Sequence, residues 1–298
     1  MKRSKRIIAA VLCLCLFCST GSAFAAGDLT SGEARAVIGA SLTDDQVAAV
    51  YGMFGIQRGS VTELTVTNAE ERSYLDGFVD PALIGTNSIS CAYLEILPEG
   101  EGLQISTQNL TWCTQEMFVN ALVTAGVDDA MIIVAAPFEV SGTAALTGIF
   151  KAYEDITGEE IDPAAKLAGT QELIITSELA DEIGSIDAVE IVNELKLILD
   201  ETQNMSDDEL REEIRRIAKE YDVSLVDSQI DQLVSLCRTL EGMNSEELKE
   251  KVEYVQNMVK KLAAAQEKVS GITRTVKIIV EKITELVFRI IAWFKGEG

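Results

Sequence analysis

The run Ser141-Gly142-Thr143 places two hydroxyl groups and a glycine in front of a segment whose apolar residues have helical spacing. The first N–H groups of a helix have no partner within the helix, so they bind anions or capping side chains. This run is therefore a possible anion-binding or ligand-binding turn. Because no Lys or Arg lies in the loop to neutralise a phosphate, we favour simple capping of the helix by the hydroxyls.

Histidine is absent from all 298 residues. Catalysis by Ser-His-Asp or Cys-His groups and histidine-ligated zinc or haem are therefore excluded. The sequence also lacks a phosphate-binding Gly-x-x-x-x-Gly-Lys motif, the Gly-x-Ser-x-Gly motif of hydrolases and a calcium-binding Asp-x-Asp-x-Asp-Gly loop. We expect no cofactor and no metal site, and we assign no catalytic residue.

Carboxylates are the remaining acid–base groups, and 48 residues are Asp or Glu. Two carboxyl groups about 5 to 9 Å apart in a sugar-sized cleft would suit a carboxylate-dependent hydrolase acting on cell-wall glycan. Because acids are so abundant, candidates arise by chance, and we favour a protein that binds without catalysis. Four candidate acids from the middle of the chain are Glu99, Glu101, Glu116 and Glu139.

The N-terminal segment 1–25 has the parts of a secretory signal peptide. Four basic residues precede an apolar run that is short for a membrane span, and an A-x-A cleavage sequence ends the segment. A lipoprotein anchored through Cys13, Cys15 or Cys18 is the alternative, but each cysteine follows a bulky residue where a lipobox needs a small one. We expect cleavage, and a secreted or cell-envelope-associated mature protein.

The mature chain is strongly acidic. Without the signal segment it has 21 basic and 48 acidic residues, a net charge near −27. Such a surface repels nucleic acid, favours solubility and attracts cations or a cationic partner. The simplest interpretation is a surface that keeps an exported protein in solution.

The turn at Ser141 is predicted to connect a buried strand to a helix. Residues 131–136 form a continuous apolar run that ends at Pro137, as in a strand buried on both faces. Apolar residues then recur at helical spacing over residues 144–153, and Gly158 ends the helix. A buried strand that leads into a helix is typical of the centre of an α/β core.

Two further runs, residues 89–97 and 103–110, are rich in strand-forming residues and are joined by a turn-rich loop. This pattern predicts a β-hairpin. Pairing across the hairpin would leave Cys91 and Cys113 roughly 13 Å apart at the rise of a strand, whereas a disulfide needs Cα atoms within about 7 Å. The chain would have to turn back after residue 110 to join them, so this pairing stays open.

Helical periodicity dominates after Asp162-Pro163. The order of elements predicts an α+β protein in which residues 26–160 form an α/β sandwich with a mixed sheet. Residues 161–270 are predicted to form an all-α helical bundle region. Order along the chain does not determine the order of strands within the sheet.

The last segment, residues 271–298, has the pattern of an amphipathic helix with a wide apolar face and a narrow stripe of charge. Five embedded charges argue against a transmembrane helix. The apolar face packs against the bundle or contacts a second subunit, and a peripheral membrane contact is the functional alternative. The possible interface residues are Ile279, Ile283, Val287, Ile290 and Phe294.

Four stretches of the chain resemble a known family: residues 97–100, 120–127, 135–138 and 140–149. On these residues the chain resembles the exported YpuA-like proteins of Gram-positive Firmicutes, which share a domain of unknown function. The resemblance covers most of the mature chain up to about residue 193. It implies export and association with the cell envelope, and it supplies no catalytic residues.

Together, these observations predict an exported, non-catalytic protein that binds or scaffolds at the cell envelope of a Gram-positive bacterium. Its expected partner is an unidentified envelope component or protein, and nucleic acid is not expected. The hydrolase of cell-wall glycan is the alternative hypothesis.

Overall fold

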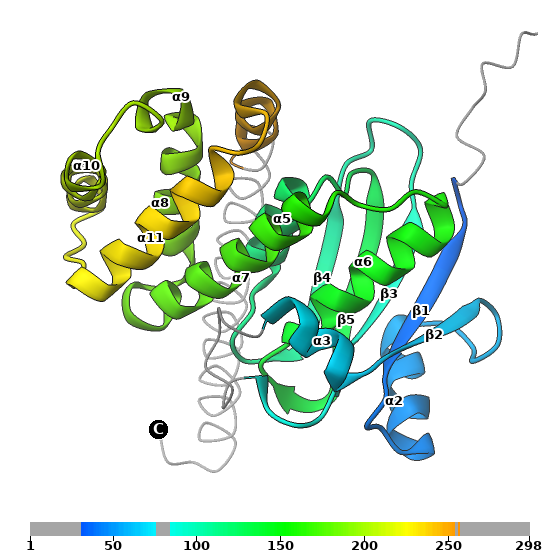
Figure 1. Ribbon diagram of the computed structural model, residues 1–298. Coiled ribbons are helices and arrows are strands. Elements are labelled where there is room, and N and C mark those ends of the chain that lie inside the picture. Colours follow the sequence, from blue (N-terminus) through cyan, green and yellow to red (C-terminus); the bar gives the residue numbers. More distant parts are fainter. Residues whose placement is uncertain (1–30, 76–83, 254–255, 257–298) are drawn as a thin grey trace, which may run out of the picture.

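The computed structural model describes residues 31–75, 84–253 and 256. The signal peptide predicted at 1–25 and the amphipathic helix predicted at 271–298 lie outside the described residues, so both stay predictions. In the described part, a sheet with helices on both faces is followed by a helical region that lies to one side of the sheet (Figure 1). The predicted α+β class, with a mixed sheet first and helices afterwards, is confirmed.

Five strands form one mixed sheet. Its members are β1 (Ala34–Gly39), β2 (Thr62–Val66), β3 (Cys91–Ile96), β4 (Gln104–Leu110) and β5 (Ala130–Val140). They lie in the order β2-β1-β3-β5-β4. The outer pairs β2–β1 and β5–β4 are parallel, whereas β1–β3 and β3–β5 are antiparallel.

The predicted β-hairpin between residues 89–97 and 103–110 is wrong, because β5 lies between β3 and β4 and pairs with both. β5 carries the long apolar run, so two neighbouring strands cover it, while the more polar β4 takes the end position in this sheet. The loop after β3 therefore crosses the start of β5, where the Leu97 N–H donates to the Asp129 carbonyl at 2.7 Å.

The strand predicted at 131–136 continues beyond Pro137 to Val140. Pro137 lies in an irregular stretch of the β4–β5 pairing, between the regular pair at Ala135 and the next pair at Val140. A proline has no N–H to donate, so strands tolerate it at such irregularities.

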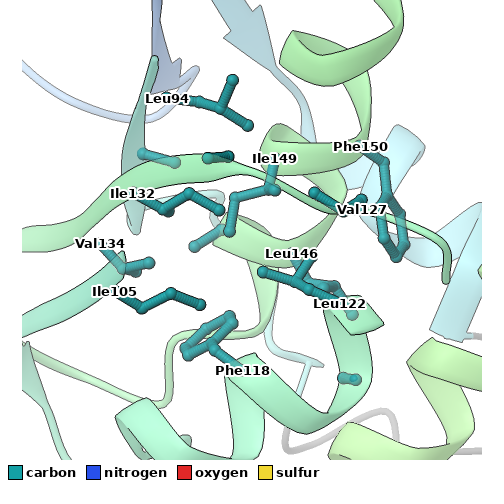
Figure 2. Close-up of a cluster of buried hydrophobic side chains, with 14 of the residues drawn as sticks. Leu94, Ile105, Phe118, Leu122, Val127, Ile132, Val134, Leu146, Ile149 and Phe150 are labelled. Carbon is teal, nitrogen blue, oxygen red and sulfur yellow. The ribbon is translucent and has the colours of Figure 1, made fainter. Parts of the chain in front are cut away.

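Helices cover both faces of the sheet because neighbouring strand residues point to opposite sides. On one face α2 (Asp44–Phe54) packs against side chains such as Ala36 and Tyr93. On the other face the adjacent residues Val37 and Leu94 join a larger core. Figure 2 shows part of that core, in which strand side chains meet those of α5 (Gln115–Thr124) and α6 (Thr143–Thr157). α3 (Asn68–Leu75) packs beside α6.

The helical region begins with Asp162, whose carboxylate accepts the N–H groups of Ala164 and Ala165. Leu173 of its first helix belongs to the core of the sheet part, whereas Leu179 belongs to the core of the helical region. This first helix therefore connects the two cores. The helices are α7 (Pro163–Ile183), α8 (Ser185–Leu197), α9 (Leu199–Thr202), α10 (Asp207–Glu220) and α11 (Asp227–Leu240), and residues 245–253 are also helical.

A buried polar seam joins α5, α7 and α8. Glu172 of α7 and Lys196 of α8 form an ion pair at 2.5 Å, and their side chains are 0% and 1% exposed. The Thr124 hydroxyl of α5 donates to the Glu172 carboxylate at 2.6 Å. Burial raises the pKa of Glu172 and lowers that of Lys196, and the opposite charge of each partner counters these shifts. Asn120, Thr176 and Asn193 lie one turn away on the same three helices and are also buried.

The helices of the seam approach closely at Gly169 of α7. A Cβ at this position would lie 2.5 Å from the Ala121 carbonyl oxygen of α5, so only glycine fits the contact. The close approach brings the two helix backbones together beside the Glu172–Lys196 pair.

We predict that Lys196→Met lowers the free energy of unfolding by about 3–5 kcal/mol, because it leaves Glu172 buried without its partner. Replacing both groups, as Glu172→Leu with Lys196→Met, restores most of that loss. Urea denaturation of the single and double variants measures the coupling between the two positions. Losses that simply add would contradict this interpretation. Lys249→Met is the control, since its ion pair with Asp200 is partly solvated and contributes less than about 1 kcal/mol.

Candidate functional site

The turn predicted to cap its own helix does not do so. Gly142, with φ 106°, is the N-cap of α6, and it provides no side-chain capping bond. The N–H of Ala145 donates instead to the Ser90 hydroxyl at 3.0 Å, from the segment just before β3. The Thr143 hydroxyl donates to the Glu71 carboxylate of α3 at 2.6 Å. The predicted capping by Ser141 and Thr143 is therefore wrong, because tertiary contacts satisfy the start of α6.

The turn borders a cavity of about 220 Å³, which Glu71 and Ser90 also line. Glu71 is only 1% exposed. Burial raises the pKa of Glu71, and the hydrogen bonds from Thr143 and Asn68 partly oppose that shift. A carboxyl group of the protein itself thus lies beside the start of α6, where an external anion would bind. Binding of an anion at Ser141, Gly142 and Thr143 stays a prediction that this neighbour makes less favourable.

We predict that Ser90→Ala lowers the free energy of unfolding by about 0.5–2 kcal/mol, because the Ala145 N–H at the start of α6 loses the Ser90 hydroxyl and keeps only its longer contact, 3.2 Å, with the Gly142 carbonyl. Ser141→Ala, which leaves that hydrogen bond intact, is the matched control and changes stability by less than about 0.5 kcal/mol. Chemical denaturation of both variants measures the difference. Equal losses, or a larger loss for Ser141→Ala, would return the capping role to Ser141.

We also predict that Glu71→Gln stabilises the protein near neutral pH and that this gain shrinks as the pH falls. Burial raises the pKa of Glu71 above its ordinary value of 4.5. As the pH falls, the Glu71 carboxylate is therefore protonated at a higher pH in the folded protein than in the unfolded chain. Protonated Glu71 therefore contributes fully to the free energy of unfolding below pH 4.5. This contribution is lost as the pH rises through the pKa of Glu71 in the folded protein. Glutamine still accepts from Thr143 and carries no charge.

The measurement is the free energy of unfolding of wild type and Glu71→Gln over a series of pH values from about 4 to 8. Glu182→Gln, at an exposed position near the end of α7, is the control and should follow the wild type. A difference between Glu71→Gln and wild type that does not change with pH would show that the Glu71 charge does not affect folding.

The four candidate acids do not form one site. Glu99 and Glu101 lie in the loop before β4, whereas Glu116 and Glu139 lie beyond its other end, at the start of α5 and near the end of β5. The seven residues of β4 separate the two groups, a length of roughly 20 Å at the rise of a strand. A catalytic pair drawn from both groups is excluded.

The three cysteines among the described residues do not form a disulfide. Cys91, Cys113 and Cys237 are all buried and free. Cys91 lies in the core on the α2 face of the sheet and Cys113 in the core on the opposite face, so the sheet separates the two thiols. Burial raises the pKa of Cys91 to about 11 and that of Cys113 to about 12. Both thiols therefore stay protonated and unreactive at neutral pH.

A larger opening lies between the sheet part and the helical region. It consists of two cavities of about 310 and 320 Å³, which share Val123 and Lys251 as lining residues. The walls come from the end of α5, the loops before β4, before β5 and between α6 and α7, and the helical segment near residue 248. We call this opening the acidic cleft, because its lining includes Asp128, Asp129, Glu159, Glu160, Asp162, Glu247 and Glu250.

Lys251 is the one basic side chain among the described residues that line the acidic cleft. Its ammonium lies 3.0 Å from the Glu247 carboxylate and 3.4 Å from that of Asp128. Burial disfavours the charge of Lys251, but the two carboxylates outweigh it and raise the pKa of this residue. The acids of the cleft belong to segments far apart in the chain, so no spacing in the sequence indicates that they meet.

Metal sites and membrane spans are both absent from the described residues. No group of three or more Cys, Asp or Glu side chains is arranged to hold a metal ion in the part of the chain that the structure describes. None of the helices in that part has the length and apolar character to cross a membrane. The possible interface residues of the 271–298 segment lie outside the described part of the chain.

Residues 38–262, well over half of the chain, match the family described as "Protein of unknown function (DUF1002)". This chain belongs to the DUF1002 family. A relative from Bacillus subtilis (strain 168), "Uncharacterized protein YpuA", is 40% identical over 212 residues, which are 70% of this chain and 72% of the relative. The resemblance to YpuA-like proteins is confirmed. No solved structure matches. Both the turn at Ser141 and the acidic cleft of this DUF1002 protein lie within the matched region.

Proposed function

We propose that this protein is an exported, non-catalytic binding protein of the cell envelope and that the acidic cleft is its binding surface. The observation that carries the proposal is the combination, in one cleft, of an apolar floor with seven acidic side chains and, among the described lining residues, one basic side chain, Lys251. Val123, Ile161 and Leu248 contribute to the floor. Such a cleft concentrates ligands of opposite charge and buries their apolar parts. The expected partner is a cationic component of the envelope.

The solvation of the cleft acids supports binding over hydrolysis. A glycan hydrolase needs one carboxyl group that an apolar pocket keeps protonated beside a second that stays ionised. In the acidic cleft Glu159, Glu160 and Glu250 are exposed to solvent. The buried carboxyl groups Glu71 and Glu172 lie elsewhere and are hydrogen-bonded to Thr143 and Thr124. Solvated acids are suited to charge recognition.

A second contact in this proposal is the amphipathic segment 271–298, whose pattern in the sequence suits a membrane surface or a protein partner. The segment has five basic and three acidic residues, in contrast to the acidic chain as a whole. Export by the predicted signal peptide would place both contacts at the cell envelope.

The test is co-sedimentation of the mature protein with purified cell walls. We predict that Glu159→Lys with Glu160→Lys weakens binding about tenfold, equivalent to roughly 1.4 kcal/mol, because it reverses two charges in the cleft. Glu182→Lys with Asp208→Lys is the control, since it makes the same change in net charge at exposed positions on α7 and α10. Added salt should weaken binding by the wild type and the control alike.

Equal loss in the two double variants would contradict a role for the cleft. Release of soluble glycan from the walls would favour the hydrolase instead. The same experiment on a chain that lacks residues 272–298, with anionic lipid vesicles alongside the walls, separates the contribution of the C-terminal segment from that of the cleft.

A further inference from the structure

The acidic cleft already contains one bound ammonium group, which belongs to the protein itself. Lys251 extends from the helical segment 245–253, and its ammonium lies between Glu247 of the same segment and Asp128 of the loop before β5. Lys251 lines both cavities, so its side chain stands where they adjoin. The geometry at this point accepts an unbranched alkyl chain that ends in a primary ammonium.

The surroundings of Lys251 extend the same preference along the cleft. Both cavities that Lys251 lines, of about 310 and 320 Å³, have apolar walls, including Leu103 in one and Ile161 in the other. The end of α5, at Ala125 and Gly126, also lines the cleft, and the C-terminal end of a helix carries partial negative charge. The cleft acids are spread along its length and do not gather around a single point that could hold a metal ion among the described residues.

We propose that the acidic cleft binds a lysine-type side chain of a peptide, whose ammonium takes the place of Lys251 between Asp128 and Glu247. The proposal rests on the proposed function and names the ligand class of the same cleft. The apolar walls contact the methylene groups of the incoming side chain, the two carboxylates pair with its ammonium, and Lys251 turns out toward solvent. Lys251 thereby limits binding to ligands that compete with its own ion pairs.

The first test removes the ammonium of Lys251 by mutation and offers the cleft the ammonium of a small molecule in its place. Lys251→Ala leaves Asp128 and Glu247 without their cation and opens space for n-butylammonium, which has the length of a lysine side chain. We expect n-butylammonium to raise the melting temperature of Lys251→Ala with increasing concentration, and by more than sodium at equal ionic strength. Lys249→Ala is the matched control, because Lys249 lies on the same segment but pairs with Asp200 outside the cleft. An equal response of Lys251→Ala to the two cations would overturn the proposal.

The second test uses peptide probes and the full mature protein. Nα-acetyl-lysine methylamide should bind Lys251→Ala about fivefold more tightly than it binds the wild type, because no internal ammonium competes. Nα-acetyl-norleucine methylamide, which lacks the ammonium, should show no such gain. If Lys251→Ala does not fold, Lys251→Gln, which keeps much of the side chain and removes its charge, provides the comparison with wild type. Binding of the lysine probe should be about fivefold tighter in Lys251→Gln, and unchanged binding would overturn the proposal.

The outcomes separate this inference from the proposed function. Cell-wall binding that depends on Glu159 and Glu160, without any preference for the lysine probe, would overturn the ligand class and leave the cleft as the binding surface. A preference for the lysine probe without cell-wall binding would support the ligand class and overturn the envelope partner.

Discussion

The buried ion pair between Glu172 and Lys196 determines how the two parts of this protein meet. Two charges removed from water destabilise a folded protein unless they lie within direct contact of each other. α7 and α8 therefore pack stably only in the register that brings the pair to 2.5 Å. Because Thr124 of α5 donates to Glu172, the same requirement extends to the sheet part. Gly169 allows the close approach of α5 and α7 that this arrangement needs.

The acidic cleft is a consequence of that packing. One wall of the cleft is the end of α5, which includes the seam residue Thr124, and the opposite wall is the segment that carries Leu248 and Lys251. Neither wall alone encloses a cavity. A change in the register of α5 against α7 would move Asp128 relative to Lys251 and separate the acids that the cleft brings together. The stability of the fold and the shape of the cleft thus depend on the same buried contacts.

Local features of the fold could be predicted from the sequence because their partners are three or four residues apart. The end of α6 at Gly158 and the start of the helical region at Asp162-Pro163 are found as expected. The predicted β-hairpin is wrong because the alternation of β3 and β4 cannot show that a later strand, β5, inserts between them. The cap of α6 could not be predicted because Ser90 lies 55 residues away from Ala145.

The acidic cleft could not be predicted for a related reason. With 48 acidic residues in the chain, the composition indicates a preference for cationic partners but not the position of a site. The position follows only from long-range packing, which brings the acids near Asp128, Glu159 and Glu247 to one opening. The sequence does indicate an acidic protein of the YpuA-like family. A cleft lined mainly by acidic side chains agrees with that composition.

The acidic cleft is, in our proposal, the surface that this protein uses at the cell envelope. Hydrogen–deuterium exchange of the full mature protein, with and without purified cell wall, tests this role most directly, because each peptide reports its own protection. We predict slower exchange in residues 123–129, 158–162 and 243–251 when cell wall is present, and no change in residues 140–145. Unchanged exchange at the cleft, together with protection of residues 140–145 around the Ser141 turn, would contradict the proposed role of the acidic cleft.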